Sequence, residues 1–302
     1  MLLSHALAND RSPMNVLVTG SASGFAQILL ARMAADPVVE LILGVDQREN
    51  LFTHERYVQI ELDLRSPQLA RVLQDVQTVI HLAPAGGDDA AARGEILEAA
   101  QNLYTSAQAA GVRQFIHLSS ALVYGAQTGK AVGESHPYGA APGCAAAEAL
   151  QAVETWLDDF EAAYPALRLL RLRPHWMLGP HADSVLARLL RQRLTLRQAQ
   201  DSQLQCVHEE DVMEAILLAL HSKLRGAFNL ACKDAAALGE LHRQTRRLRL
   251  PVATQRLARR LETAPGCIDA LVRPLVLNSK RARSELGWKP RYDRVHDLVR
   301  QC

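Results

Sequence analysis

The sequence lacks the features that define several protein classes. Only 5% of its 302 residues are aromatic, and its five cysteines form no Cys-x-x-C pair and no Cys/His cluster. This spacing indicates neither a metal site nor a disulfide framework. The sequence contains no run of about eighteen apolar residues, the length that spans a membrane. Its first thirteen residues lack the basic start and cleavage site of a signal peptide. We therefore expect reduced thiols, no bound metal, no membrane partner and a cytoplasmic protein.

The charge is small overall but unevenly distributed. The net charge is +2, yet residues 221–302 carry 18 Lys/Arg against 7 Asp/Glu, a balance of +11, and the first 220 residues carry −9. A basic C-terminal part could favour an anionic substrate or an acidic partner, although solvated helix faces would account for the same arginines. Aromatic residues do not alternate with the arginines, so nucleic acid is not an expected partner.

Short apolar runs alternate with helical patterns through the first two thirds of the chain. The expected strands cover residues 15–19, 39–45, 57–62, 78–82, 114–118 and 167–172. The helices between them are expected at residues 24–35, 66–74, 88–110 and 143–163. Near-continuous apolar strands separated by helices are typical of a parallel sheet covered on both faces. The pattern predicts an α/β fold with a doubly wound parallel sheet of the Rossmann type.

The alternation ends after Pro174. The remainder predicts helices at residues 183–193, 209–221 and 235–247 and one short strand at residues 227–230. We expect residues 1–13 to form a loose tail or an over-long start, and residues 14–174 to form the Rossmann domain. Residues 175–302 should form a smaller, mostly helical lobe on the substrate side, interleaved with that domain.

A glycine-containing turn follows the first expected strand, at residues 19–26. Gly20 permits a tight turn and Gly24 lets the backbone approach phosphates, while the helix that follows directs its first N–H groups at them. Asp46 ends the second strand, where a carboxylate accepts hydrogen bonds from an adenosine ribose. The sequence therefore predicts NAD as the cofactor, and Arg48 leaves NADP open. In the alternative interpretation the glycines only form a turn and Asp46 caps the segment that follows it.

Longer motifs from residue 14 onward carry a resemblance to a known family. They are Glu61-Leu-Asp-Leu64, Val79-Ile-His-Leu-Ala83, His117-Leu-Ser-Ser-Ala-Leu-Val-Tyr-Gly125, Leu172-Arg-Pro174, Leu178-Gly-Pro180, Val207-His-Glu-Glu-Asp-Val212 and residues 281–290. Together they resemble the extended short-chain dehydrogenase/reductases of the NAD-dependent epimerase/dehydratase type, such as UDP-glucose 4-epimerases.

The resemblance implies a cofactor site and a substrate class. The implied cofactor-binding residues are Gly20, Ser23, Gly24, Phe25, Asp46, Asp63, Leu64, Ala83 and Pro84, with Asp63 and Leu64 beside the adenine. It also implies Ser120 as the serine that faces the substrate. A nucleotide sugar or another secondary carbinol would be that substrate, and residues 88–110 and 143–163 would form the interface of a homodimer.

The catalytic pair of the family is not found where the resemblance places it. In the family a Tyr hydroxyl transfers a proton, and a Lys four residues later lowers the pKa of that Tyr. Matching residues 145–150 to the family's helix puts Ala140 at the Tyr position and Cys144 at the Lys position. Tyr138 could still reach Ser120 from the preceding loop, with His136 or Arg173 supplying positive charge, or it could be a pocket or surface residue.

Three functions therefore remain open. The chain could be an NAD(P)-binding, epimerase/dehydratase-like protein that acts on or binds a nucleotide sugar or other secondary carbinol. It could be catalytically silent and sense a dinucleotide or bind a partner. It could also be a dehydrogenase or reductase for a hydrophobic ketone or alcohol, because Trp176 and Met177 predict a bulky, apolar floor for the substrate cleft.

Overall fold

The computed structural model describes residues 13–82, 90–127, 130–192, 194–196, 201–244 and 250–299. All but the last residue of the expected N-terminal tail lies outside these ranges. The predicted cofactor residues Ala83 and Pro84 also lie outside them.

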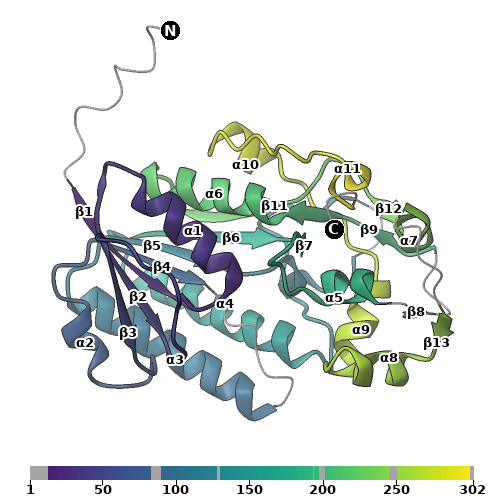
Figure 1. Cartoon of the computed structure of the whole chain (residues 1–302), viewed down its shortest axis with the longest axis horizontal. Coiled ribbons are helices and arrows are strands. Elements are labelled where there is room, and N and C mark those ends of the chain that lie inside the picture. Colours follow the sequence, from purple (N-terminus) through teal and green to yellow (C-terminus); the bar gives the residue numbers. More distant parts are fainter. Residues whose placement is uncertain are drawn as a thin grey trace, which may run out of the picture.

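A parallel sheet of seven strands forms the centre of the molecule (Figure 1). The strands are β1 (Met14–Thr19), β2 (Val39–Asp46), β3 (Tyr57–Glu61), β4 (Thr78–Leu82), β5 (Gln114–Leu118), β6 (Arg168–Pro174) and β11 (Gly226–Leu230). Their order is β11-β6-β5-β4-β1-β2-β3, and every neighbouring pair is parallel. The predicted α/β fold class is confirmed, and each expected strand is present.

The strand order reverses at β1. The chain runs outward from β1 to β2 and β3, then returns to the other side of β1 as β4, where Thr19 and His81 are register partners. In an open α/β sheet, such a reversal leaves a crevice at the carboxyl ends of the strands. The ends of β1 and β4 therefore lie where open α/β sheets bind their ligands.

Helices cover both faces of this sheet (Figure 1). One face carries α1 (Gly24–Ala34) and α6 (Glu209–His221), and the other carries α2 (Leu69–Val72), α3 (Ala90–Ala109) and α4 (Ala145–Ala163). Leu29, Leu30 and Met33 of α1 are fully buried on the first face. Tyr104 of α3 and Phe115 of β5 are fully buried on the second. Each such side chain contributes about 1.5–3 kcal/mol on burial, so these contacts hold the layers on the sheet.

The C-terminal part forms the expected smaller lobe, but with more short strands than expected. Its elements are β7 (Trp176–Leu178), α5 (Val185–Arg191), β8 (Leu194–Leu196), β9 (Gln203–Leu204), β10 (Cys206–His208), β12 (Ala236–Ala237), α7 (Leu238–Gln244), β13 (Leu250–Val252), α8 (Thr254–Arg260), α9 (Pro265–Val272), α10 (Lys280–Ser284) and α11 (Val295–Val299). Strands of two or three residues are too short to show a period-two pattern. β11 comes from this half of the chain yet pairs with β6, so both halves share one sheet. In the described part of the chain, no helix is long and apolar enough to cross a membrane.

Cys144 and Cys267 form a disulfide, and the expectation that all thiols are reduced was wrong for this pair. Cys144 directly precedes α4 and Cys267 lies in α9, so the bond joins elements 123 residues apart in sequence. Sequence spacing could not reveal it, because the pairing depends on α9 folding back against α4. Cys206 and Cys232 are buried and take part in no disulfide among the described residues.

Candidate functional site

The turn from β1 into α1 forms a cradle of backbone N–H groups. Gly20 has a φ of +71°, and a Cβ there would lie 3.0 Å from the carbonyl oxygen of the last residue of β4. The Oγ of Ser23 caps α1 by accepting a hydrogen bond from the backbone N–H of Ala26, at 3.1 Å. The N–H groups of Gly24 and Phe25 have no hydrogen-bond partner among the described residues. With the positive end of the helix dipole, these groups can receive phosphate oxygens.

A histidine from the C-terminal lobe packs against Gly24 of this turn. A Cβ on Gly24 would lie 3.2 Å from Cδ2 of His181, so only glycine lets the imidazole approach α1 without a shift. Glu209 holds His181 in place: its Oε2 accepts from the His181 backbone N–H at 3.0 Å, and its Oε1 lies 3.0 Å from the ring Nδ1. Gly24 therefore serves the packing of the two halves of the chain as well as the cradle.

Asp46 lies beside the glycine turn at the end of β2. One carboxylate oxygen accepts from the backbone N–H of Ala22 at 3.0 Å, and the other accepts from the backbone N–H of Arg48 at 3.0 Å. The Arg48 side chain is 72% exposed and forms an ion pair with Asp46 at 3.5 Å. Asp46 thus does cap the next segment, while its position beside the cradle also suits the predicted contact with a ribose. The two interpretations of this residue are compatible.

Asp63 and Leu64 follow β3 at the same edge of the sheet. Oδ2 of Asp63 accepts from Nη2 of Arg65 at 2.7 Å, and hydrogen bonds from Arg65 lower the pKa of this carboxyl. The carbonyl oxygen of Leu64 accepts from Nδ2 of Asn102 on α3, at 2.5 Å. Both predicted residues are therefore held by neighbouring side chains at the crevice edge.

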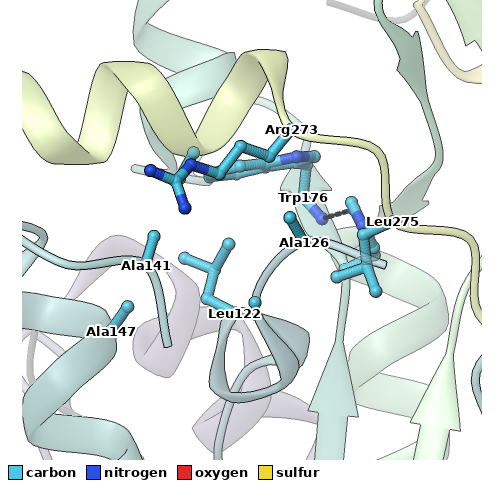
Figure 2. Close-up of a pocket in the computed structure, with 10 residues that line it drawn as sticks. Leu122, Ala126, Ala141, Ala147, Trp176, Arg273 and Leu275 are labelled. Carbon is cyan, nitrogen blue, oxygen red and sulfur yellow. Dashed lines mark hydrogen bonds between the residues drawn. The ribbon is translucent and has the colours of Figure 1, made fainter. Parts of the chain in front are cut away.

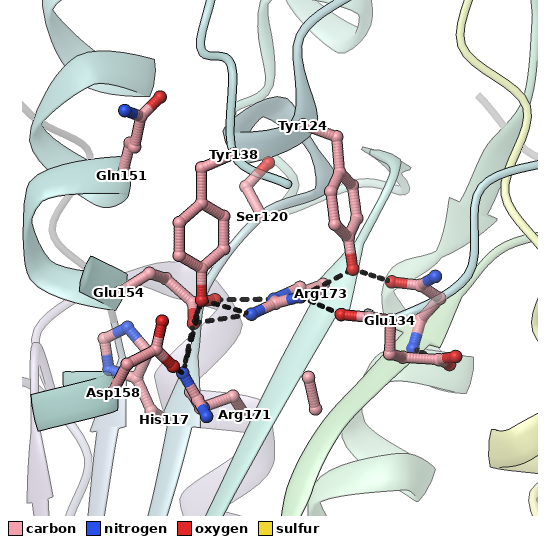
Figure 3. A network of polar contacts seen from close by, with 12 residues as sticks. His117, Ser120, Tyr124, Glu134, Tyr138, Gln151, Glu154, Asp158, Arg171 and Arg173 are labelled. Atoms are coloured by element: carbon pink, nitrogen blue, oxygen red, sulfur yellow. Dashed lines mark hydrogen bonds and ion pairs between the residues drawn. The ribbon is translucent and has the colours of Figure 1, made fainter. Parts of the chain in front are cut away.

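A buried network of charged side chains lies between β6 and α4 (Figure 3). The carboxylate of Glu154 is fully buried and accepts from Nε and Nη2 of Arg173 at 2.7 and 2.8 Å, and from Nη1 of Arg171 at 3.1 Å. Burial alone would raise the pKa of Glu154, but the hydrogen bonds from Arg173 and the charges of both arginines lower it to about 2. This network fixes α4 against the sheet.

The Tyr138 hydroxyl is part of this network. It accepts hydrogen bonds from Nη2 of Arg173 at 2.9 Å and from Nη1 of Arg171 at 3.4 Å. It donates one to Oε2 of Glu154 at 3.4 Å. Burial and the negative charge of Glu154 raise the pKa of Tyr138 despite the two arginines. Arg173 thus supplies a positive charge beside Tyr138, as the sequence suggested, but the hydroxyl points away from Ser120 in Figure 3.

The hydroxyls of Ser120 and Tyr124 also make contacts within the protein. Ser120 caps the short helix η1 (Ala121–Tyr124), where its Oγ accepts from the backbone N–H of Leu122 at 3.2 Å. Tyr124 is buried, donates to Oδ1 of Asn229 at 2.9 Å and accepts from Nη1 of Arg173 at 2.6 Å. Tyr124 therefore anchors the network rather than facing solvent.

The structure places neither Ala140 nor Cys144 within α4. α4 begins at Ala145, so Ala140 lies outside it and Cys144, in its disulfide, precedes its first turn. The two residues do not share a helix face. α4 itself contains neither Tyr nor Lys, and no Tyr of the sequence is followed by Lys four residues later.

A small apolar pocket lies between η1, the start of α4 and α9 (Figure 2). Its volume is about 10 Å³, which is room for about one water molecule. Leu122, Ala147 and Trp176 form apolar walls, and Arg273 extends above them in Figure 2. The buried His175 lines the pocket, and burial lowers its pKa to about 4. In the described part of the chain, no group of three or more His, Cys, Asp or Glu side chains could hold a metal ion.

The reversed strand order, the glycine turn and the acid at the end of β2 define a protein of the dinucleotide-binding Rossmann class. Residues 16–231 match the model of the NAD dependent epimerase/dehydratase family, and the chain belongs to this family.

Known relatives and solved structures are similar to nearly the whole chain. A protein of unassigned function from Mycobacterium tuberculosis (strain H37Rv) is 26% identical over 311 residues, which cover 94% of this chain and 82% of that protein. MoeE5 in complex with UDP-glucuronic acid and NAD is 23% identical, with a TM-score of 0.79 over 95% of this chain and 97% of that one. The UDP-glucose 4-epimerase of Thermus thermophilus in complex with NAD is 21% identical, with a TM-score of 0.77 over 95% and 98%. At these identities the two structures show a shared fold.

Proposed function

We propose that this protein binds NAD at the crevice beside β1 and does not carry out the Tyr/Lys proton transfer of its family. The observation that carries the proposal is a contrast between two elements. The glycine turn is a formed cradle with two N–H groups available for phosphate, whereas α4 offers neither Tyr nor Lys. Binding and chemistry use different parts of the fold, so one can persist without the other.

The residues of the cradle fit a dinucleotide. Gly24 and Phe25 present N–H groups to a pyrophosphate, and Asp46 presents a carboxylate to a ribose diol. A carboxylate repels the 2′-phosphate of NADP, which supports NAD, although the exposed Arg48 leaves some room for NADP. MoeE5 and the Thermus epimerase, which share the fold, were both solved with NAD.

The environment of Tyr138 supports the absence of turnover. The pKa of a Tyr is ordinarily near 10 and must fall to about 7 for the side chain to act as a base at neutral pH. This requires about 4 kcal/mol of added stabilisation of the charged form. Burial and Glu154 move the pKa of Tyr138 in the opposite direction.

A second candidate is hydride transfer at a nucleotide sugar or another secondary carbinol, with Ser120 and Tyr138 as the catalytic groups. The ligands of structural neighbours favour it, since MoeE5 was solved with UDP-glucuronic acid. The apolar wall that includes Leu122 and Trp176 would suit a hydrophobic ketone or alcohol better than a sugar. A homodimer through α3 and α4 stays a prediction.

The test compares binding with turnover in the same preparation. Calorimetry should detect NAD binding. Chromatography should show no conversion of UDP-sugars or dTDP-sugars, because an epimerase or dehydratase regenerates its NAD, and the absorbance of reduced nicotinamide should stay constant with secondary alcohols. Turnover at about 1 per second or faster that Tyr138→Phe abolishes would overturn the proposal and identify Tyr138 as the catalytic group. Tyr164→Phe is the matched control, because Tyr164 is 38% exposed at the end of α4.

A further inference from the structure

A groove of about 690 Å³ lies at the amino ends of β5, β6 and β11. The strands are parallel, so this is the edge of the sheet opposite to the glycine cradle. Four basic residues line it: Arg113 before β5, Arg168 at the start of β6, and Lys223 and Arg225 before β11. No acidic residue is among its lining residues.

Arg168 and Arg225 are each held by a backbone carbonyl that lies close to the other arginine in sequence. Nη1 of Arg168 donates to the carbonyl oxygen of Ser222, in the connection that carries Arg225. Nη1 of Arg225 donates in return to the carbonyl oxygen of Pro165, in the connection that leads into Arg168, at 2.7 Å. A guanidinium has five N–H donors, so each keeps donors for a ligand while its position is held.

The positive charge of the groove is not balanced. None of the four basic side chains forms an ion pair with a residue that the structure describes, whereas Arg171, Arg173 and Arg283 each pair with a carboxylate. Like charges that share one groove repel each other, and a bound anion would relieve that repulsion. Lys223 and Arg225 belong to the basic part of the sequence, but Arg113 and Arg168 come from its acidic first part. Folding therefore brings together basic residues that are far apart in the sequence.

We propose that this groove binds a small molecule carrying two or more phosphate or carboxylate groups. The groove is open to solvent, and its volume leaves room for a small polyanion. A strand of nucleic acid would need aromatic side chains along a longer track, and no aromatic residue lines the groove. The proposal concerns the edge away from the cofactor crevice and does not depend on NAD binding.

The test is calorimetric titration with inorganic tripolyphosphate and with citrate, at low ionic strength and with NAD present in excess to fill the cradle. Tripolyphosphate and citrate distinguish a phosphate ligand from a carboxylate ligand. The groove variant Arg113→Ala/Lys223→Ala removes two exposed side chains that make no described side-chain bond. The control Arg259→Ala/Arg260→Ala removes the same charge from the exposed face of α8.

We expect one equivalent of tripolyphosphate or citrate to bind, with affinity that falls as salt rises. The groove variant should weaken binding at least tenfold, and the control less than twofold, while NAD titrations stay unchanged in both. No binding at millimolar concentration, or an equal loss in both variants, would overturn the proposal. Tighter binding of hexaglutamate than of either small anion would also overturn it, in favour of an acidic protein segment.

Discussion

A disulfide joins Cys144, which directly precedes α4, to Cys267 in α9, and the two residues are only 1% and 2% exposed. The backbones beside them are in close contact, since a Cβ on Gly266 would lie 2.3 Å from the carbonyl carbon of Gly143. The disulfide therefore holds α9, which contributes Ala270 to the apolar pocket, against the start of α4.

Removing this disulfide should lower the free energy of unfolding. The double variant Cys144→Ser/Cys267→Ser should lose about 4 to 5 kcal/mol in the chain-entropy model, because the bond closes a loop of 123 residues in the unfolded chain. Urea unfolding without reductant measures this loss. Five cysteines with one disulfide leave three thiols to react in the denatured, unreduced protein, and five after reduction. Five reactive thiols before reduction would show that the bond does not form.

Asp46→Ala should weaken NAD binding. The charge-assisted hydrogen bonds that its carboxylate offers to a ribose diol are worth about 1 to 3 kcal/mol, which corresponds to a loss of roughly 5- to 150-fold. Calorimetry on the wild type and the variant measures the change. Arg48→Ala is the control, because its exposed side chain should matter for NADP but little for NAD. Equal or tighter binding of NADP by the wild type would refute the assignment of Asp46.

Glu154→Gln should destabilise the protein by about 3 to 5 kcal/mol at neutral pH, since it leaves Arg171 and Arg173 without their shared buried carboxylate. The pKa of Glu154 falls from an ordinary 4.5 to about 2 on folding. Its contribution is therefore complete above about pH 4.5 and is lost as the pH falls towards 2. Urea unfolding at several pH values should show a weaker acid dependence in the variant over this window. Asp158→Asn is the control: Asp158 also pairs with Arg171 but is 47% exposed, so it should cost less than about 1 kcal/mol.

His175→Gln should reduce the pH dependence of stability between about pH 6.5 and 4. Burial lowers the pKa of His175 from 6.5 to about 4, so the unfolded chain takes up its proton first as the pH falls. One such histidine costs about 1.4 kcal/mol of unfolding free energy for each pH unit below 6.5. The same sign applies to the buried His81 and His117, whose pKa values fall to about 3 and 4. If wild type and His175→Gln lose stability in parallel from pH 6.5 to 5, His175 does not titrate as proposed.

Local sequence patterns were enough to predict the strands of the central sheet and the glycine turn. Apolar runs of four to seven residues predict strands, and each of these runs became a strand of the sheet. Gly20 and Asp46 were identifiable because a tight turn and a strand end are local features of the chain. The helix from Glu209 to His221 was predicted at its observed bounds for the same reason.

Long-range packing, by contrast, set what surrounds the candidate site. It placed His181 against Gly24, turned the Tyr138 hydroxyl into the Arg173 network and paired Cys144 with Cys267. Each of these contacts joins residues far apart in the chain, so no local period or spacing encodes it. Which side chains meet depends on how the C-terminal lobe packs against the sheet, and that packing minimises the free energy of the whole molecule rather than of any one segment.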